Sequence, residues 1–290
     1  MNFRDEAELN KEEIISARRY LHAHPELSFE ENETTAYLAV ELIKLGIEPH
    51  LFQNVTGLWA ELGTCDRAKG QKTILLRADI DALPIQECTG LPFASENDGV
   101  MHACGHDGHM AMLLGAAKLL KAHEKELPGR VRILFQPAEE SCHGAEFVIR
   151  EGILEDVDAV YGSHVWGILD SPGIDVTPGQ RMTSCDNFTI TVKGKAAHGS
   201  APNFGRDAIV AAAAIILQVQ TLVSRKNDPR NSLAITIGEI QGGTVFNVIA
   251  DEVVMKGTVR THSSEVREQV EGWLREVISF TAKANGTEAE

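Results

Sequence analysis

Apolar and polar positions follow two different patterns along the chain, and the pattern changes near residue 185. In the first part, residues 11–22 and 33–45 carry apolar side chains at helical spacing. The second segment is followed by Gly46, a residue that commonly ends helices. We therefore predict two amphipathic helices at the start of the chain.

Short apolar runs come next, and helical patterns at 106–122 and 142–151 separate them. The runs lie at 73–78, 131–135 and 159–162, with a weaker one at 57–62. Apolar strands that alternate with helices are typical of α/β proteins with a mostly parallel sheet. The pattern predicts such a domain over residues 1–184.

The second part of the chain has the strict alternation of strands that are exposed on one face. Residues 187–192, 233–240 and 252–260 predict strands, and 206–223 and 264–284 predict helices. The order β-α-β-β-α lacks one strand of a ferredoxin-like α+β unit. The sequence stops at Glu290, where we expect that strand to begin. We predict a second domain over residues 185–290.

Composition narrows the class of protein. The chain has 290 residues, with 42 acidic and 27 basic side chains and a formal net charge of −15. This balance argues against nucleic acid as a partner, because phosphate binding needs a basic surface. The N-terminus lacks the apolar run of a signal peptide, and the longest apolar candidate for a membrane span, 208–219, is short and alanine-rich. Five scattered cysteines favour reduced thiols and a cytoplasmic protein without a membrane partner.

Polar side chains gather where the predicted strands end. Asp79 follows the first strong run, Glu139 and Glu140 follow the second, and His164 follows the third. The segment HACGHDGH, residues 102–109, opens the helix between the first two runs. Because ligands bind beyond the carboxyl ends of strands in open α/β sheets, we expect these side chains to meet at one sheet edge.

A thiolate, imidazoles and carboxylates together suit a divalent transition metal such as zinc, manganese, cobalt or nickel. Magnesium or calcium sites are built from oxygen ligands and do not need a thiolate. In a pair of glutamates, one can bind the metal while its neighbour accepts a proton from water, whose pKa the metal lowers towards ~7. The set therefore predicts hydrolysis of an amide bond.

Six motifs in this order resemble the metal-dependent aminoacylase/carboxypeptidase family. They are RADIDALP, MHACGHDGHMA, FQPAEES, GSHVWG, GKAAHGSAP and GGTVFNVIADEV. The closest likeness is to its amidohydrolase branch, which includes hippurate hydrolase, indoleacetyl-amino acid hydrolase and N-acetyldiaminopimelate deacetylase. The resemblance spans essentially the whole chain and implies hydrolysis of small N-acyl or N-aminoacyl amino acids, or dipeptide-like substrates, with one or two metal ions.

The resemblance also assigns roles to residues of the first part. Glu139 matches the catalytic acid/base, and Asp79 matches an aspartate behind the metal that orients a ligand. The metal ligands that it implies are Cys104, His106, Glu140 and His164.

The second part resembles the family's inserted lid, or dimerisation, domain and implies a homodimer formed through it. His198 matches a histidine presented to the partner subunit's active site. Asn247 and Arg260 match positions that line the substrate pocket. Family members continue beyond this domain with a segment that completes the first sheet and brings a last histidine ligand. This chain stops before it, so we expect a fragment or a truncated product with an incomplete metal site.

Two other functions fit the sequence less well. One is a cysteine hydrolase with Cys104 as nucleophile and a histidine base. The other is a truncated, inactive chain that retains only lid-mediated dimerisation. Several polar residues stay outside the predicted site. Asp81 and Asp107 are interpreted as turn residues or as support for a ligand, His102 and His109 as support or helix surface, and the segment HAHPEL, residues 22–27, as a helix end or part of the pocket.

Overall fold

Apolar spacing correctly predicts the helices that begin the chain. The computed structural model describes residues 3–290 and contains α2 (Lys11–Ala23) and α3 (Asn32–Lys44) at the expected places. A short helix, α1 (Phe3–Leu9), precedes them and was not predicted. In α3, Leu38 and Leu42 are fully buried one turn apart, as the helical spacing requires.

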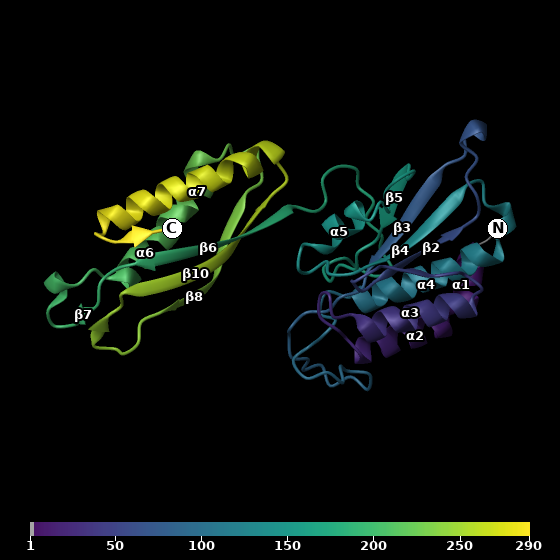
Figure 1. Ribbon diagram of the computed structural model, residues 1–290, viewed down its shortest axis with the longest axis horizontal. Coiled ribbons are helices and arrows are strands. Elements are labelled where there is room, and N and C mark those ends of the chain that lie inside the picture. Colours follow the sequence, from purple (N-terminus) through teal and green to yellow (C-terminus); the bar gives the residue numbers. More distant parts are fainter. Residues whose placement is uncertain (1–2) are drawn as a thin grey trace. The chain divides into compact units, whose positions relative to one another are not determined.

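The first sheet contains the predicted strands in the order β1-β2-β4-β3-β5 (Figure 1). Three of them run parallel: β4 (Arg130–Gln136), β3 (Thr73–Asp79) and β5 (Ala159–Gly162). On the other side, β2 (Leu58–Leu62) pairs antiparallel with β4, and β1 (His50–Leu51) pairs antiparallel with β2. The predicted α/β class with a largely parallel sheet is confirmed.

Helices cover this sheet on both faces. α4 (His106–Ala122) packs beside α2 and α3 in a cluster that includes Leu21, Met110 and Phe135. A smaller cluster with Leu75 and Val148 joins the other face to α5 (Gly144–Arg150). Two 3₁₀ turns, η1 (Arg67–Lys69) and η2 (Glu124–Glu126), complete the unit. The connections from β3 to α4 and from β4 to α5 carry the polar motifs, and both therefore leave the same buried sheet.

The second compact unit runs from Asp175 to Glu290, and the first ends at Ile174. The predicted domain boundary, 184/185, falls at the start of β6, ten residues later (184 − 174). The second unit contains β6 (Ser184–Lys193), α6 (Ala208–Thr221), β8 (Ala234–Gly242), β10 (Glu252–Thr261), α7 (Ser264–Ala284) and β11 (Glu288–Ala289). Its sheet is antiparallel with the order β11-β6-β10-β8, as in a ferredoxin-like unit.

Two details of this unit differ from the sequence expectation. The fourth strand, which we expected only at the end of the sequence, has already begun as β11 and pairs with β6. A separate ribbon of β7 (Ala197–His198) and β9 (Val248–Ile249) lies outside the main sheet, and the short 3₁₀ helix η3 (Pro202–Phe204) follows β7. The sequence did not predict β11 at these residues or the β7–β9 ribbon, because strands of two residues show no alternation.

Helix α6 continues into a π-helical turn, η4 (Leu222–Lys226). By length and composition alone, the segment Ala208–Lys226 is apolar enough to cross a membrane, and 33% of its apolar window is buried. Its buried face, with Ala212, Ile215 and Val219, belongs to the core beneath the sheet. A core helix passes the same test, so this segment is weak evidence for a membrane span.

Candidate metal centre

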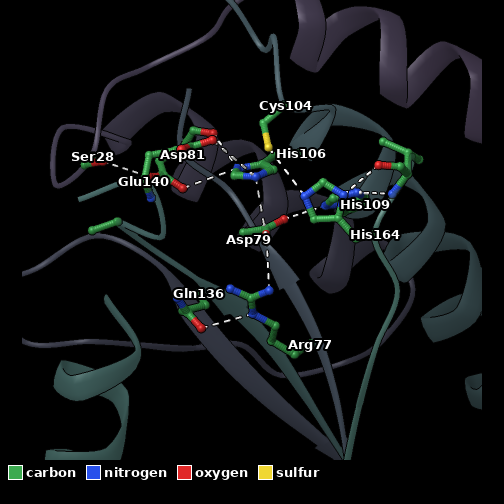
Figure 2. A network of polar contacts seen from close by, with 12 residues as sticks. Ser28, Arg77, Asp79, Asp81, Cys104, His106, His109, Gln136, Glu140 and His164 are labelled. Carbon is green, nitrogen blue, oxygen red and sulfur yellow. Dashed lines mark hydrogen bonds and ion pairs between the residues drawn. The ribbon is translucent and has the colours of Figure 1, made fainter. Parts of the chain in front are cut away.

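The carboxyl ends of the parallel strands bring the predicted residues to one edge of the first sheet. Asp79 is the last residue of β3, the two glutamates follow β4, and His164 follows β5. His106 opens α4 on the same side (Figure 2). Gly105 precedes it with a φ of 90°, and a Cβ atom there would lie 2.3 Å from Val165 Cγ2. A glycine is therefore needed to bring the Cys104–His106 turn against the segment after β5.

The potential metal-binding atoms form three groups that share His106; one contains Asp79 and His109, and the other two contain the four predicted ligands. In the first of these two, Cys104 Sγ lies 3.4 Å from His164 Nε2, and both atoms lie within 4.8 Å of a ring nitrogen of His106. In the second, His106 Nε2 lies 3.8 Å from Glu140 Oε1, with a Glu139 oxygen inside the same 4.8 Å limit. The structure thus brings together all four side chains predicted to bind metal.

Hydrogen bonds leave one nitrogen of each histidine free to face this space. His106 Nδ1 donates to the carbonyl of Asp81 at 2.8 Å, and His164 Nδ1 donates to the carbonyl of Val165 at 2.6 Å. Among the described residues, His106 Nε2 and Glu140 Oε1 are buried without a hydrogen-bond partner. Buried polar atoms rarely lack a partner, and a metal ion between them would supply it. The residues present therefore fit a bound divalent cation.

The local charge also favours a cation. Burial alone would lower the pKa of His106, but the hydrogen bond with Asp81, the nearby Cys104 thiol and the charge of Asp79 raise it to about 11. The surroundings thus stabilise a positive charge next to this ring. A metal ion can provide that charge in place of the proton, since metal binding to histidine displaces a proton.

Asp79 lies beneath this space and remains ionised. Burial raises its pKa, but the hydrogen bond from His109 and the charge of Arg77 outweigh burial and hold the pKa well below its usual range. His109 Nδ1 donates to Asp79 Oδ1 at 2.6 Å, and Arg77 donates to Oδ2 at 2.9 Å. Asp79 Oδ2 in turn lies 3.6 Å from His106 Nε2. Figure 2 shows Arg77 also reaching Gln136, which continues the network along the sheet.

Asp81 supports the site more directly than a turn residue does. Its carboxylate lies 3.4 Å from His106 Nδ1 and accepts hydrogen bonds from the backbone N–H of Glu140 and the hydroxyl of Ser28. It therefore links two of the potential metal-binding residues. The alternation of Asp79 and Asp81 in RADIDALP was the available signal, because Asp79 ends the buried strand β3 and Asp81 follows it two residues later.

Glu139 is half-buried beside Glu140. Burial raises the pKa of its carboxyl group, and the negative charges of Glu140 and Asp79 raise it further. A carboxylate with a raised pKa is a better proton acceptor near neutral pH than a solvated one. This environment suits the predicted role of Glu139 as a general base.

Two histidines of the HACGHDGH segment outside the predicted set are buried. His109 accepts a hydrogen bond from the Val165 backbone N–H at 2.9 Å, so it connects Asp79 to the residue after His164. His102 is also buried, and neither of its ring nitrogens has a hydrogen-bond partner in the described part of the chain. The spacing of HACGHDGH did not distinguish a supporting role from a place on the helix surface for either histidine.

The segment HAHPEL begins with two histidines in different surroundings. His22 is buried and contacts Asp107 at 2.9 Å and Glu87 at 3.3 Å, while the side chain of His24 is 42% exposed. Arg18 also pairs with Asp107. His22 therefore holds the first turn of α4, which His106 opens.

The second unit places two of its three predicted residues together. His198 lies in β7 and Asn247 immediately precedes β9, and the Gly199 backbone N–H donates to the Asn247 carbonyl at 2.8 Å. Both side chains are exposed, and His198 Nδ1 contacts the Ser200 hydroxyl at 2.7 Å. Arg260 lies eight residues from the start of β10, roughly 26 Å along the strand. Within this unit the three do not form one site.

Comparisons with known proteins identify the family. The sequence profile of Peptidase family M20/M25/M40 matches residues 75–282. An N-acetyl-L-cysteine deacetylase of Bacillus subtilis is 47% identical over 280 residues, which cover 95% of this chain and 67% of that protein. This chain belongs to Peptidase family M20/M25/M40. The predicted family is therefore confirmed.

Other members of the M20/M25/M40 family agree with this assignment. Hippurate hydrolase of Campylobacter jejuni is 39% identical, over 95% of this chain and 71% of that protein. The crystal structure of a dinuclear metal-binding M20 peptidase from Bacillus subtilis is 42% identical with a TM-score of 0.76, over 96% of this chain and 72% of that one. The predicted enzyme class, a metal-dependent amidohydrolase, and the predicted fold are confirmed.

Proposed function

We propose that this chain hydrolyses the amide bond of small N-acyl amino acids and that Glu139 moves the proton. The observation that supports this most strongly is the meeting of Cys104 Sγ, His164 Nε2, His106 Nε2 and Glu140 Oε1 at one sheet edge, with the last two atoms buried and without a hydrogen-bond partner. These four residues would hold the metal, and the half-buried Glu139 lies beside them.

A bound divalent cation supplies Lewis acidity, which makes a nearby water more acidic and polarises a carbonyl. The chain's own residues do the rest. The hydrogen bonds of His106 to Asp81 and of His164 to Val165 fix each ring so that Nε2 points into the site. The raised pKa of Glu139 suits it to accept a proton from the attacking water and to deliver it to the leaving amine.

The relatives guide the choice of substrates and metals. Enzymes named for N-acetylcysteine and hippurate are among them, so we propose an N-acylated amino acid, including dipeptide-like ones, as the substrate class. The two groups that contain the predicted ligands offer room for one or two ions, which we propose to be zinc, manganese, cobalt or nickel. All five cysteines are free thiols, which supports the proposed cytoplasmic location.

The second unit would supply the remaining contacts. We propose that it forms a homodimer and that His198 reaches the partner subunit's site, where an imidazole would steady the developing oxyanion. Asn247 and Arg260 would then contact the substrate. The exposure of all three side chains is consistent with contacts that form outside this single chain.

Replacing Glu139 by Gln tests the central assignment. The amide keeps the shape but cannot accept the proton, so we expect hydrolysis to fall about 10²–10⁴-fold while metal content per chain is unchanged. Activity is measured on N-acetyl-L-cysteine, hippurate and indoleacetyl-amino acids, and metal by elemental analysis. Glu146→Gln is a matched control, because Glu146 is exposed on α5, where it pairs with Arg150 of the same helix. Undiminished activity in Glu139→Gln would overturn the assignment.

The alternative cysteine mechanism has one observation in its favour, the 3.4 Å contact between Cys104 and His164. However, burial and the charge of Glu140 outweigh the hydrogen bond to His106 and raise the pKa of Cys104, whereas a nucleophilic thiol needs a lowered pKa. A cysteine enzyme would resist chelators and be inactivated by thiol alkylation. We expect the reverse order of sensitivity: chelation abolishes activity. Metal content far below one ion per chain, with no hydrolysis of any substrate, would instead support the inactive-chain hypothesis.

A further inference from the structure

A fully buried carboxylate, Glu31, lies on the side of the catalytic glutamates that faces the protein interior. Glu31 immediately precedes α3 and is 0% exposed. Its Oε1 accepts a hydrogen bond from the backbone N–H of Ala138 at 2.8 Å. Its Oε2 accepts a hydrogen bond from the hydroxyl of Thr56. Burying a carboxylate is unfavourable unless hydrogen bonds compensate, so these two contacts explain how Glu31 is tolerated there.

The backbone that Glu31 contacts is strained. Ala138 has a φ of 55°, in the left-handed region, although it is not a glycine and is fully buried. Such a conformation is unfavourable for an alanine and persists only when the surroundings enforce it. Ala138 is followed directly by Glu139 and Glu140, so the direction in which both side chains leave the backbone depends on this residue.

Other contacts hold the rest of the turn. The Ala138 carbonyl accepts hydrogen bonds from the Gly144 N–H at 3.0 Å and the Ser141 hydroxyl at 3.1 Å. The Glu140 N–H donates to Asp81 at 2.8 Å. The acceptor that the structure gives for the Ala138 N–H is the Glu31 carboxylate. Without it, a buried N–H would be left unpaired at a strained residue.

We propose that Glu31 is a positioning residue: its carboxylate holds Ala138 in the left-handed turn and thereby sets where the Glu139 and Glu140 side chains point. This inference rests on the function proposed above for Glu139. Glu31 itself does not reach the reacting atoms, because it is buried beneath the turn. Its contribution to the reaction is the placement of a proton acceptor, for which displacements of about 1 Å are costly.

The test compares Glu31→Ala and Glu31→Gln with Thr56→Val in the full chain. Alanine removes the acceptor, so we expect kcat on N-acetyl-L-cysteine with added manganese to fall about ten- to a hundredfold, with KM changed by less than about twofold. Faster hydrogen exchange at the Ala138 amide, read by NMR or mass spectrometry, should accompany the loss. Glutamine can still accept from Ala138, so it should restore most of kcat and slow exchange.

Thr56→Val is the matched control, because it removes the other hydrogen bond of Glu31 and leaves the bond to Ala138. We expect it to lower the melting temperature while kcat and exchange at Ala138 stay near the wild-type values. If Glu31→Ala does not fold, Glu31→Asp replaces it, since one CH₂ fewer withdraws the carboxylate by about 1.5 Å without removing the charge. The proposal is overturned if kcat of Glu31→Ala, or of Glu31→Asp in its place, equals that of Thr56→Val. Unchanged hydrogen exchange at the Ala138 amide in the Glu31 variant overturns it as well.

The two proposals fail in different ways. If Glu139→Gln keeps full activity, Glu139 is not the base, yet exchange at Ala138 still reports whether Glu31 holds the turn. If Glu139→Gln is inactive and Glu31→Ala retains wild-type kcat, only the positioning role is wrong.

Discussion

At the scale of single residues, the site is organised by side chains outside the four predicted ligands. His109 is the clearest case, because it joins β3 to the segment after β5 through one ring. It donates from Nδ1 to Asp79 and accepts at Nε2 from the Val165 N–H. Val165 follows His164, so the imidazole of His109 restricts where that histidine can lie. We infer that metal affinity depends on His109.

Two amide substitutions of His109 separate its two contacts. An asparagine amide lies near the position of Nδ1 and can keep the bond to Asp79. A glutamine amide lies near Nε2 and can keep the bond to Val165. We expect His109→Asn to weaken metal affinity about 10–100-fold, since the His164 segment is released, and His109→Gln to weaken it less. Competition with a chromophoric chelator measures the affinities. The reverse order would show that the contact with Asp79 matters more.

The sequence identified the residues that carry reactive chemistry and Asp79 as a residue that orients a ligand, left Asp81 and His109 open, and overlooked Glu31. Cys104, His106, Glu140 and His164 could be selected because each follows a strand or opens a helix. Glu31 could not, because its partner Ala138 is 107 residues away and contributes only a backbone N–H. Backbone donors have no sequence signature, and a lone glutamate before a helix is usually a solvated residue.

At the scale of elements, long periodic segments were predicted almost to the residue. The expected helices 106–122 and 264–284 match α4 (His106–Ala122) and α7 (Ser264–Ala284). Short elements such as α1 and the β7–β9 ribbon were missed, because a helix of two turns or a strand of two residues shows too few repeats of its own period. These elements depend on tertiary contacts that a local pattern does not contain.

The contact between α2 and α3 offers a pH test at this scale. Tyr37 of α3 stacks on Tyr20 of α2 with ring centroids 4.3 Å apart. Burial, with the charges of Glu41 and Tyr20, raises the pKa of Tyr37 to about 12, above the ordinary value near 10. Between these values the folded chain binds more protons than the unfolded chain. Stability from this group is therefore complete below about pH 10 and is lost as the pH rises towards 12.

Tyr37→Phe should remove this alkaline loss. We expect the free energy of unfolding of the wild type to fall relative to Tyr37→Phe as the pH rises from about 10 to 12, with a constant difference between pH 7 and 9. Urea unfolding at each pH measures it. Tyr161→Phe serves as a control, because Tyr161 is 59% exposed on β5. A difference that does not change with pH would contradict the role of Tyr37.

At the scale of the whole molecule, the two compact units have separate cores. The clusters around Phe135 and Leu75 contain residues of the first unit alone, and the cluster around Ile215 contains residues of the second alone. The potential metal-binding side chains all belong to the first unit. A metal ion that binds only the folded state of one unit stabilises that unit, by about 4 kcal/mol at a thousandfold excess over Kd.

Metal should therefore separate two thermal transitions. We expect calorimetry of the metal-free chain to show a transition that rises in temperature on addition of manganese or zinc and a second that does not move. Leu38→Ala should lower the temperature of only the first transition, and Ile215→Ala that of only the second. Each should reduce the free energy of unfolding of its unit by about 2–5 kcal/mol, since both side chains are at most 1% exposed. If metal and both substitutions shift one common transition, the units unfold together and the metal stabilises the whole chain. Separate responses would instead mean that the metal centre depends on its own sheet for stability, so loss of metal would leave the second unit folded.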